Sequence, residues 1–153
     1  MKPIVRYGWK IYFHPLFFQQ WEDLLNRVKT LKQKLAPEDF IGHSDAKLLK
    51  AIDQGIKETI PQDPLASYLA LTGALRKFSR LKKKGLPNRY RLFFRVFSEQ
   101  QSIIILWLGF PRKEGDKRDC YVVFEKLVKK GEFPKSMTDF IAIIEDEDTL
   151  RFE

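Results

Sequence analysis

The spacing of the apolar residues changes from a helical period to a strand period near Gly73. Before that point, apolar residues recur every three or four positions over residues 17–31 and 48–60, which predicts two amphipathic helices. An aromatic and β-branched segment, Gly8 to His14, precedes them and predicts a short strand. Residues 37–42 are predicted to form a loop between the helices.

After Gly73, alternating apolar and polar residues predict three strands, over residues 75–83, 89–97 and 103–108. The third is apolar on both faces, so we expect it at the centre of the sheet. A last helix is predicted over residues 118–130, ended by Gly131. The predicted fold class is α+β: an N-terminal strand and two helices, then a three-strand antiparallel meander and a C-terminal helix.

The chain has 153 residues, enough for one domain with its own core. We expect this domain over residues 1–134 and a weakly structured acidic tail over residues 135–153. The longest apolar run, Ile103 to Phe110, is far shorter than the roughly 20 residues that cross a bilayer. Cys120 is the only cysteine, which excludes an intramolecular disulfide and a cysteine zinc cage. We therefore expect a soluble, cytoplasmic protein with no membrane partner, no metal and no cofactor.

The positive charge is concentrated in the second half of the chain. Residues 75–131 hold 16 Lys and Arg against 5 Asp and Glu, a net charge of +11, whereas the whole chain carries +8. Such a concentration is typical of a surface that binds phosphates, with a merely solvated basic surface as the alternative. The acidic residues Glu145 to Asp148 could fold over that surface as a phosphate mimic, or could simply be a solvated end.

Alternation along the strands predicts where these cations lie. Arg80 and Lys82 share one face of their strand and Leu81 the other. In the next strand, three arginines and Phe93 share a face, while the residues between them face the core. The predicted RNA-binding residues are the cations and the aromatic ring of this region: Arg89, Phe93, Arg95, Lys83, Lys84, Lys113 and Arg118. Cations interleaved with an aromatic ring suit single-stranded RNA, whose bases can stack.

Several cations and one phenol that converge on a phosphate could cleave RNA through its own 2′-hydroxyl. That reaction needs a proton taken from the 2′-oxygen, a proton given to the leaving 5′-oxygen, and positive charge around the phosphorane. Arginine can bind the phosphate in a bidentate manner. A lysine or a tyrosine with a pKa lowered by neighbouring cations could act as the base. Nucleic-acid binding without cleavage remains an alternative for the same residues.

The segment Asn88-Arg89-Tyr90-Arg91-Leu92-Phe93-Phe94-Arg95, followed by Ile103-Ile104-Ile105-Leu106-Trp107, resembles the RelE/ParE toxin superfamily, and specifically its YhaV-type branch. Gly8-Trp9, Tyr12-Phe13-His14-Pro15, Lys47-Leu48-Leu49, Phe78-Ser79-Arg80-Leu81-Lys82 and Asp119-Cys120-Tyr121-Val122-Val123-Phe124 extend the resemblance over residues 7–134. The resemblance implies a RelE-like fold and an endoribonuclease toxin of a type II toxin–antitoxin pair. The implied substrate is mRNA, often on the ribosome, and the implied inhibitor is an AbrB-type (PrlF-like) antitoxin.

The resemblance also implies the catalytic residues. They are the basic strand pair Arg80 and Lys82, the phosphate-binding Arg91, the loop arginine Arg112, and the helix tyrosine Tyr121. Lys113 and Arg118 are alternatives to Arg112. A ParE-like relative would instead poison DNA gyrase without cutting RNA, so gyrase inhibition is a rival function on the same fold.

Two further residues could have a structural or a chemical role. His14 is a candidate proton carrier, or else a structural histidine. Cys120 is expected to pack within the helix rather than act as a nucleophile, because no motif places a histidine near it.

Overall fold

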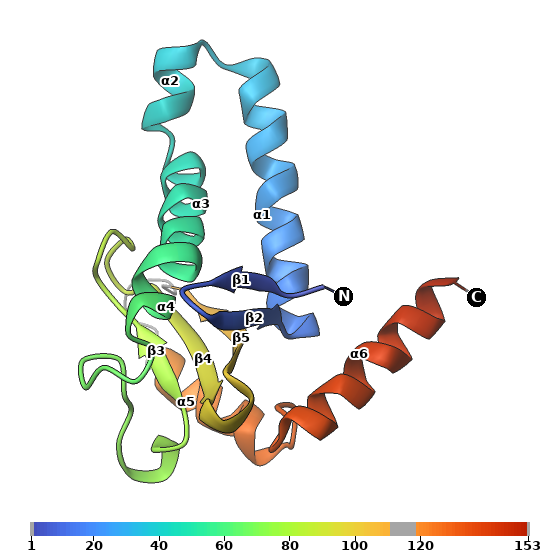
Figure 1. The fold of residues 1–153 in the computed structure, drawn as a ribbon. Helices are drawn as coiled ribbons and strands as arrows, with labels where there is room; N and C mark the ends of the chain where they lie inside the picture. The colour runs from blue at the N-terminus through green and yellow to red at the C-terminus, as the bar shows by residue number, and fades with distance from the viewer. Residues whose placement is uncertain (1, 111–118, 153) are drawn as a thin grey trace.

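A five-stranded mixed sheet forms the centre of the molecule (Figure 1). The computed structural model describes residues 2–110 and 119–152, with side chains described as far as residue 146. The strand order is β1 (Ile4–Arg6), β2 (Trp9–Phe13), β5 (Ser102–Gly109), β4 (Arg91–Phe97) and β3 (Ser79–Leu81). Strands β2 and β5 are parallel, and every other neighbouring pair is antiparallel. The two N-terminal strands thus share one sheet with three strands from the middle of the chain.

The strand bounds differ from the prediction at three places. Strand β1 was not predicted; it pairs with β2 through a two-residue turn in which Tyr7 and Gly8 have φ of 51° and 82°. Positive φ at both positions matches the twist of a tight hairpin. Strand β3 is shorter than predicted, because Leu75 belongs to a 3-10 turn and Lys83 has a left-handed φ of 60°. Strand β4 begins at Arg91 rather than at Arg89, whose φ of 72° is incompatible with an extended strand.

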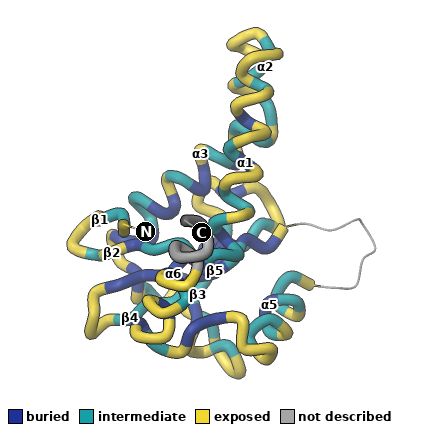
Figure 2. The backbone as a smooth tube through the Cα atoms, turned by 90° about the vertical axis from the view of Figure 1, so that its right-hand side faces the viewer, coloured by how far each residue is buried: buried dark blue, intermediate teal, exposed yellow. Residues whose placement is uncertain are grey.

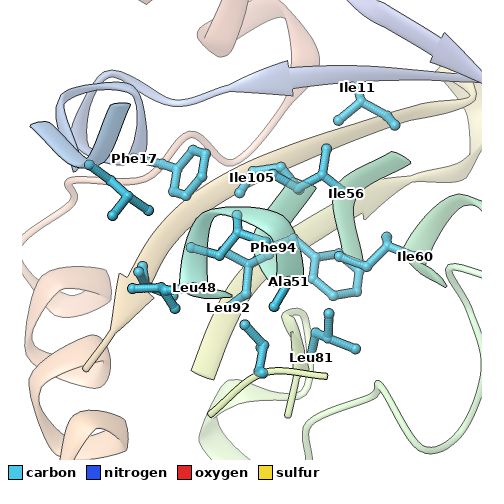
Figure 3. Close-up of a cluster of buried hydrophobic side chains, with 14 of the residues drawn as sticks. Ile11, Phe17, Leu48, Ala51, Ile56, Ile60, Leu81, Leu92, Phe94 and Ile105 are labelled. Atoms are coloured by element: carbon cyan, nitrogen blue, oxygen red, sulfur yellow. The ribbon is translucent and has the colours of Figure 1, made fainter. Parts of the chain in front are cut away.

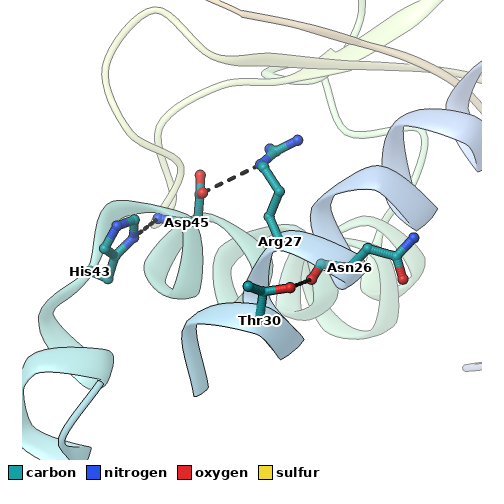
Figure 4. A network of polar contacts seen from close by, with 5 residues as sticks. All are labelled: Asn26, Arg27, Thr30, His43 and Asp45. Atoms are coloured by element: carbon teal, nitrogen blue, oxygen red, sulfur yellow. Dashed lines mark hydrogen bonds and ion pairs between the residues drawn. The ribbon is translucent and has the colours of Figure 1, made fainter. Parts of the chain in front are cut away.

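Helices α1 (Pro15–Lys34), α2 (Pro37–Gly42) and α3 (Ser44–Gln54) form a hairpin that extends beyond the sheet (Figure 1). Residues 37–42, predicted as a loop, are helical, since Pro37 stands in the first turn with two acidic residues. In Figure 4, the ion pair Arg27–Asp45 at 3.3 Å joins α1 to α3, and His43 Nδ1 accepts the N–H of Asp45. Figure 2 shows α2 as mostly exposed.

A glycine sets the contact between this hairpin and the sheet. Helix α3 continues into a π-helical turn (Gly55–Thr59) and the short helix α4 (Ile60–Gln62). A Cβ atom on Gly55 would lie 2.6 Å from Cδ2 of Leu81, which is fully buried on β3. The glycine therefore lets the helix approach the strand that carries Arg80.

Two apolar clusters cover the two faces of the sheet. The first lies against the helical hairpin and includes Phe17, Ile56, Leu92, Phe94 and Ile105 (Figure 3). It confirms that Leu92 and Phe94 face the core and that β5 is central and buried. The second lies under α5 (Cys120–Lys129) and α6 (Met137–Phe152) and is built on fully buried phenylalanines, Phe93, Phe124 and Phe140.

The segment after residue 134 is a helix, where a weakly structured tail was expected. Met137, Phe140 and Ile144 of α6 are buried in the second cluster. Their spacing of three and four residues places them on one face of the helix, which explains how an acidic segment packs against the sheet. The first part of α6 therefore contributes to the core of the domain.

Candidate active site

The hydroxyl of Tyr121 accepts two hydrogen bonds from arginines of neighbouring strands. Arg80 Nε on β3 donates to it at 3.0 Å, and Arg91 Nε on β4 donates at 3.1 Å. All three side chains are half-buried. The structure thus brings together three of the five predicted catalytic residues at one oxygen atom.

The backbone fixes the positions of these three side chains. On β3 and β4, Arg80 lies opposite Phe93, and the ring of Phe93 meets the ring of Tyr121 edge-on at 5.6 Å. The carboxylate of Asp119 caps α5 and accepts the N–H of Tyr121 at 2.8 Å. Tyr121 is therefore held both by its ring and by the start of its helix.

A second glycine lets α5 begin against the sheet. Gly109 lies opposite Arg91, and a Cβ there would be 2.9 Å from Cβ of Cys120 and 3.2 Å from Phe93. Real Cβ atoms are not found that close to another atom, so any other residue at 109 would push the first turn of α5 outward. This close approach is what brings Tyr121 within reach of the two guanidinium groups.

Each guanidinium is also bound on its other side by a backbone carbonyl. Arg80 Nη1 donates to the carbonyl of Tyr68, and Arg91 Nη1 donates to the carbonyl of Tyr90, both at 2.9 Å. Together with the hydrogen bond to Tyr121, this contact uses two of the five N–H groups of each arginine. The remaining N–H groups of two oriented guanidiniums are suited to the oxygens of a phosphate.

Phe93 is not a base-stacking residue, contrary to the prediction. Its ring is 0% exposed and stacks on Phe124 at a centroid distance of 4.1 Å. Alternation placed it correctly on the face of the arginines, but α5 covers that face at this point.

Arg95 lies on the same strand as Arg91 but makes other contacts. Its guanidinium donates to the carbonyl of Pro134 at 3.2 Å and lies 4.7 Å from the ring centre of Phe97. Burial lowers the pKa of Arg95. These contacts tie β4 to the segment before α6, which is a structural role.

The remaining predicted cations fall into two groups. The first surrounds the turn between β3 and β4: Lys82 is half-buried just after β3, and the exposed members are Lys83, Lys84 and Arg89. Arg89 stands in a turn and does not share a strand face with Arg91. The second group, Arg112, Lys113 and Arg118, lies outside the described residues. Their segment begins after Phe110 and ends before Asp119.

His14 has the structural role that was one of its two interpretations. Its ring is 4% exposed, and it contacts the rings of Phe133 and Phe140. Its Nδ1 accepts the N–H of Leu16 at 3.1 Å, and its Nε2 lies 3.0 Å from the carbonyl of Glu132. Both nitrogens are thus engaged by backbone groups.

Cys120 is half-buried between Gly109 and Asp119. Burial raises the pKa of its thiol, and the nearby carboxylate of Asp119 raises it further. A raised pKa keeps the thiol protonated and weakly nucleophilic, as expected for a packing role.

Tyr68 was missed by the sequence reasoning. It contacts Arg80 through its backbone carbonyl, which leaves no trace in a side-chain pattern. Over residues 2–110 and 119–152, no cluster of three or more His, Cys, Asp or Glu has a metal-binding arrangement. In the same part of the chain, every helix is too short or too polar to cross a membrane.

The fold and this site can now be compared with known proteins. Residues 11–145 match a family described as toxins with endonuclease activity, of toxin–antitoxin systems, the YhaV-type toxins. The chain belongs to this family. It is 36% identical over 134 residues to "Ribonuclease toxin YhaV" of Escherichia coli (strain K12), a match that covers 83% of this chain and 86% of that protein. The YhaV-type resemblance is thereby confirmed, as is the expected class of toxin with nuclease activity.

Solved structures with a related arrangement include the isolated E. coli RelE toxin, which is 15% identical and aligns with a TM-score of 0.44 over 78% of this chain and 95% of its own. The toxin–antitoxin complex RelBE2 from Mycobacterium tuberculosis is 16% identical, with a TM-score of 0.40 over 67% of this chain and 98% of its own. Membership of a toxin–antitoxin family makes an antitoxin the partner of this chain.

Proposed function

We propose that this toxin is a metal-independent endoribonuclease that cleaves mRNA at the site formed by Arg80, Arg91 and Tyr121. The observation that supports this proposal best is the pair of hydrogen bonds from the two guanidiniums to one phenol oxygen. The E. coli relative is named a ribonuclease, which favours RNA as the substrate.

In the proposed mechanism the 2′-hydroxyl of the RNA attacks the adjacent phosphorus, so that the products are a 2′,3′-cyclic phosphate and a 5′-hydroxyl. Arg91 and Arg80 bind the non-bridging oxygens and stabilise the negative charge of the phosphorane. Since the lone pairs of the Tyr121 oxygen face the two arginines, its O–H proton points toward the open side of the site. Tyr121 therefore donates that proton to the leaving 5′-oxygen, as a general acid.

Other residues complete the proposed site. Lys82 binds the RNA backbone or takes the proton from the 2′-oxygen, and Arg112 adds positive charge, with Lys113 and Arg118 as alternatives. Lys83, Lys84 and Arg89 border the site and bind neighbouring phosphates. We further propose that the toxin acts in the cytoplasm on ribosome-bound mRNA, and that its antitoxin is of the AbrB type.

The test uses cleavage of mRNA in EDTA by the parent toxin, Tyr121→Phe and Arg91→Ala, with and without ribosomes. Tyr121→Phe keeps the ring on Phe93 and removes only the hydroxyl, so we expect cleavage to fall about 100- to 10,000-fold while the fold is retained. Arg91→Ala should reduce cleavage by about 100- to 1,000-fold. Val122→Ala, next to Tyr121 and 45% exposed, is the control and should retain activity.

Cleavage that EDTA abolishes and Mg²⁺ restores would contradict the metal-independent mechanism. A Tyr121→Phe variant as active as the parent would remove Tyr121 from the mechanism. Inhibition of DNA gyrase without RNA cleavage would support the rival function.

A further inference from the structure

We infer that Tyr68 and Lys84 form a nucleobase-binding subsite beside the site of cleavage, in which a base next to the scissile phosphate stacks on the Tyr68 ring. This inference rests on the proposed function and assigns a substrate contact to the side chain of Tyr68, which the proposed mechanism does not use. It starts from one guanidinium, that of Arg80, which donates both to the Tyr121 hydroxyl and to the Tyr68 carbonyl.

The backbone beside Tyr68 is fixed on the edge of the sheet. Leu69 is fully buried, and its carbonyl accepts the N–H of Arg80 at 2.8 Å. Ala70 forms an isolated β-bridge with Ser79, and Leu71 donates to the carbonyl of Phe78 at 3.1 Å. Residues 69–71 therefore extend the sheet next to β3, and Tyr68 stands at the end of this rigid segment.

The side chain of Tyr68 is exposed although its backbone is fixed. The residue is 48% exposed, and the Lys84 ammonium lies 5.3 Å from its ring centre. A single exposed aromatic residue on a protein surface is ordinary. This one is attached to a catalytic arginine through its carbonyl and has a cation beside its ring, the combination that single-stranded RNA uses for stacking and backbone binding.

Arg80 contacts both the Tyr121 hydroxyl and the Tyr68 carbonyl, so Tyr68 is a direct neighbour of the residue that binds the scissile phosphate in the proposed mechanism. The Lys84 ammonium can then bind the next phosphate while the base stacks. Because every base has a π face, the subsite is expected to accept any base. Purines should bind better than pyrimidines, because their larger rings stack more strongly on the Tyr68 ring.

The test uses a short RNA in which the parent cleavage position has been mapped, together with copies that carry an abasic nucleotide on either side of that position. Tyr68→Ala should reduce kcat/KM on the intact RNA about 10-fold, whereas Tyr68→Phe, which keeps the ring, should stay within about twofold of the parent. On one of the two abasic RNAs, parent and Tyr68→Ala should cleave equally. Leu65→Ala, 62% exposed in the same loop, is the matched control and should resemble the parent.

Equal losses for Tyr68→Ala on the intact and on both abasic RNAs would overturn the inference, since the variant would then act through the orientation of Arg80. A Tyr68→Ala variant as active as the parent would overturn it as well. Binding of an RNA that carries a 2′-deoxynucleotide at the cleavage position, measured by fluorescence anisotropy, gives a second readout that needs no cleavage. If Tyr121→Phe still cleaves RNA while Tyr68→Ala binds the RNA weakly, the proposed mechanism fails and the subsite stands. If Tyr121→Phe loses cleavage while Tyr68→Ala binds the RNA as tightly as the parent, only the subsite is rejected.

Discussion

One imidazole ring joins three parts of this chain. His14 Nδ1 accepts the first N–H of α1, from Leu16, and Nε2 faces the carbonyl of Glu132, between α5 and α6. Because Nδ1 accepts, the single proton of the neutral ring is assigned to Nε2, which donates to that carbonyl. Burial lowers the pKa of His14 from its ordinary value of 6.5. Protonation would end the cap on α1 and place a charge among phenylalanine rings.

The pKa of His14 predicts a loss of stability in acid. Since the folded pKa lies below the unfolded value of 6.5, the unfolded chain binds the proton first as the pH falls. The free energy of unfolding should therefore be independent of this group above about pH 7.5 and should decrease below pH 6.5, until the folded pKa is reached. Urea unfolding of the parent and of His14→Asn, at pH 8 and pH 5, measures this decrease.

His14→Asn should be less stable than the parent at pH 8 and should lose less stability on acidification. The control is Thr30→Ala, an exposed and non-titratable position on the same helix α1, which should retain the acid response of the parent. If the free energy of unfolding fell between pH 8 and pH 5 by the same amount in His14→Asn as in the parent, the acid response would belong to other groups.

At the scale of helices and strands, prediction succeeded where periodicity was continuous. The central, two-sided burial of β5 and the amphipathic face of α1 follow from apolar spacing alone. The ends of β3 and β4 do not, because Arg89 adopts a left-handed conformation that only the folded turn requires. The helical spacing after residue 134 was present but was obscured by the acidic residues on its other face.

The same limits apply to the candidate site. Arg80, Arg91 and Tyr121 could be predicted because each belongs to a strand or helix with a clear pattern and to a segment of the family resemblance. Phe93 was assigned wrongly because alternation gives two faces without showing which face a later helix covers. Tyr68 could not be found, because its contact is made by a backbone carbonyl.

Gly55 gives a prediction for the contact between α3 and β3. In an exposed helix, Gly→Ala stabilises by about 0.5–1 kcal/mol. Here the added Cβ would lie 2.6 Å from a fully buried Leu81 side chain, so we expect Gly55→Ala to destabilise by about 1–3 kcal/mol through overpacking. Thermal unfolding of the variant and the parent measures this loss of stability. Gly42→Ala, with no atom within 4 Å of its Cβ, is the control and should not lower the Tm. A Gly55→Ala variant as stable as Gly42→Ala would show that Leu81 can move aside.

For the whole molecule, the main electrostatic feature is the basic segment of net charge +11 that carries the site, while the rest of the chain sums to −3. RNA and an acidic segment of an antitoxin would both be attracted to it. We therefore expect the antitoxin to inhibit by occupying the basic surface in place of RNA. Helix α6 packs onto the second cluster through Met137, Phe140 and Ile144, whereas Glu145 and Asp146 are exposed.

This expectation is tested by reversing one charge at a time. Lys82 follows β3 and is half-buried. Lys82→Glu should weaken both RNA cleavage and antitoxin binding, and the association rate with antitoxin should fall as salt screens charges beyond about 8–10 Å. Lys29→Glu makes the same change of charge on the exposed side of α1 and should alter neither. If Lys82→Glu lost cleavage but bound antitoxin as tightly as the parent, while Lys29→Glu bound weakly, the antitoxin would sit on the helical hairpin. Inhibition would then have to act by blocking access of the toxin to its RNA substrate rather than by filling the site.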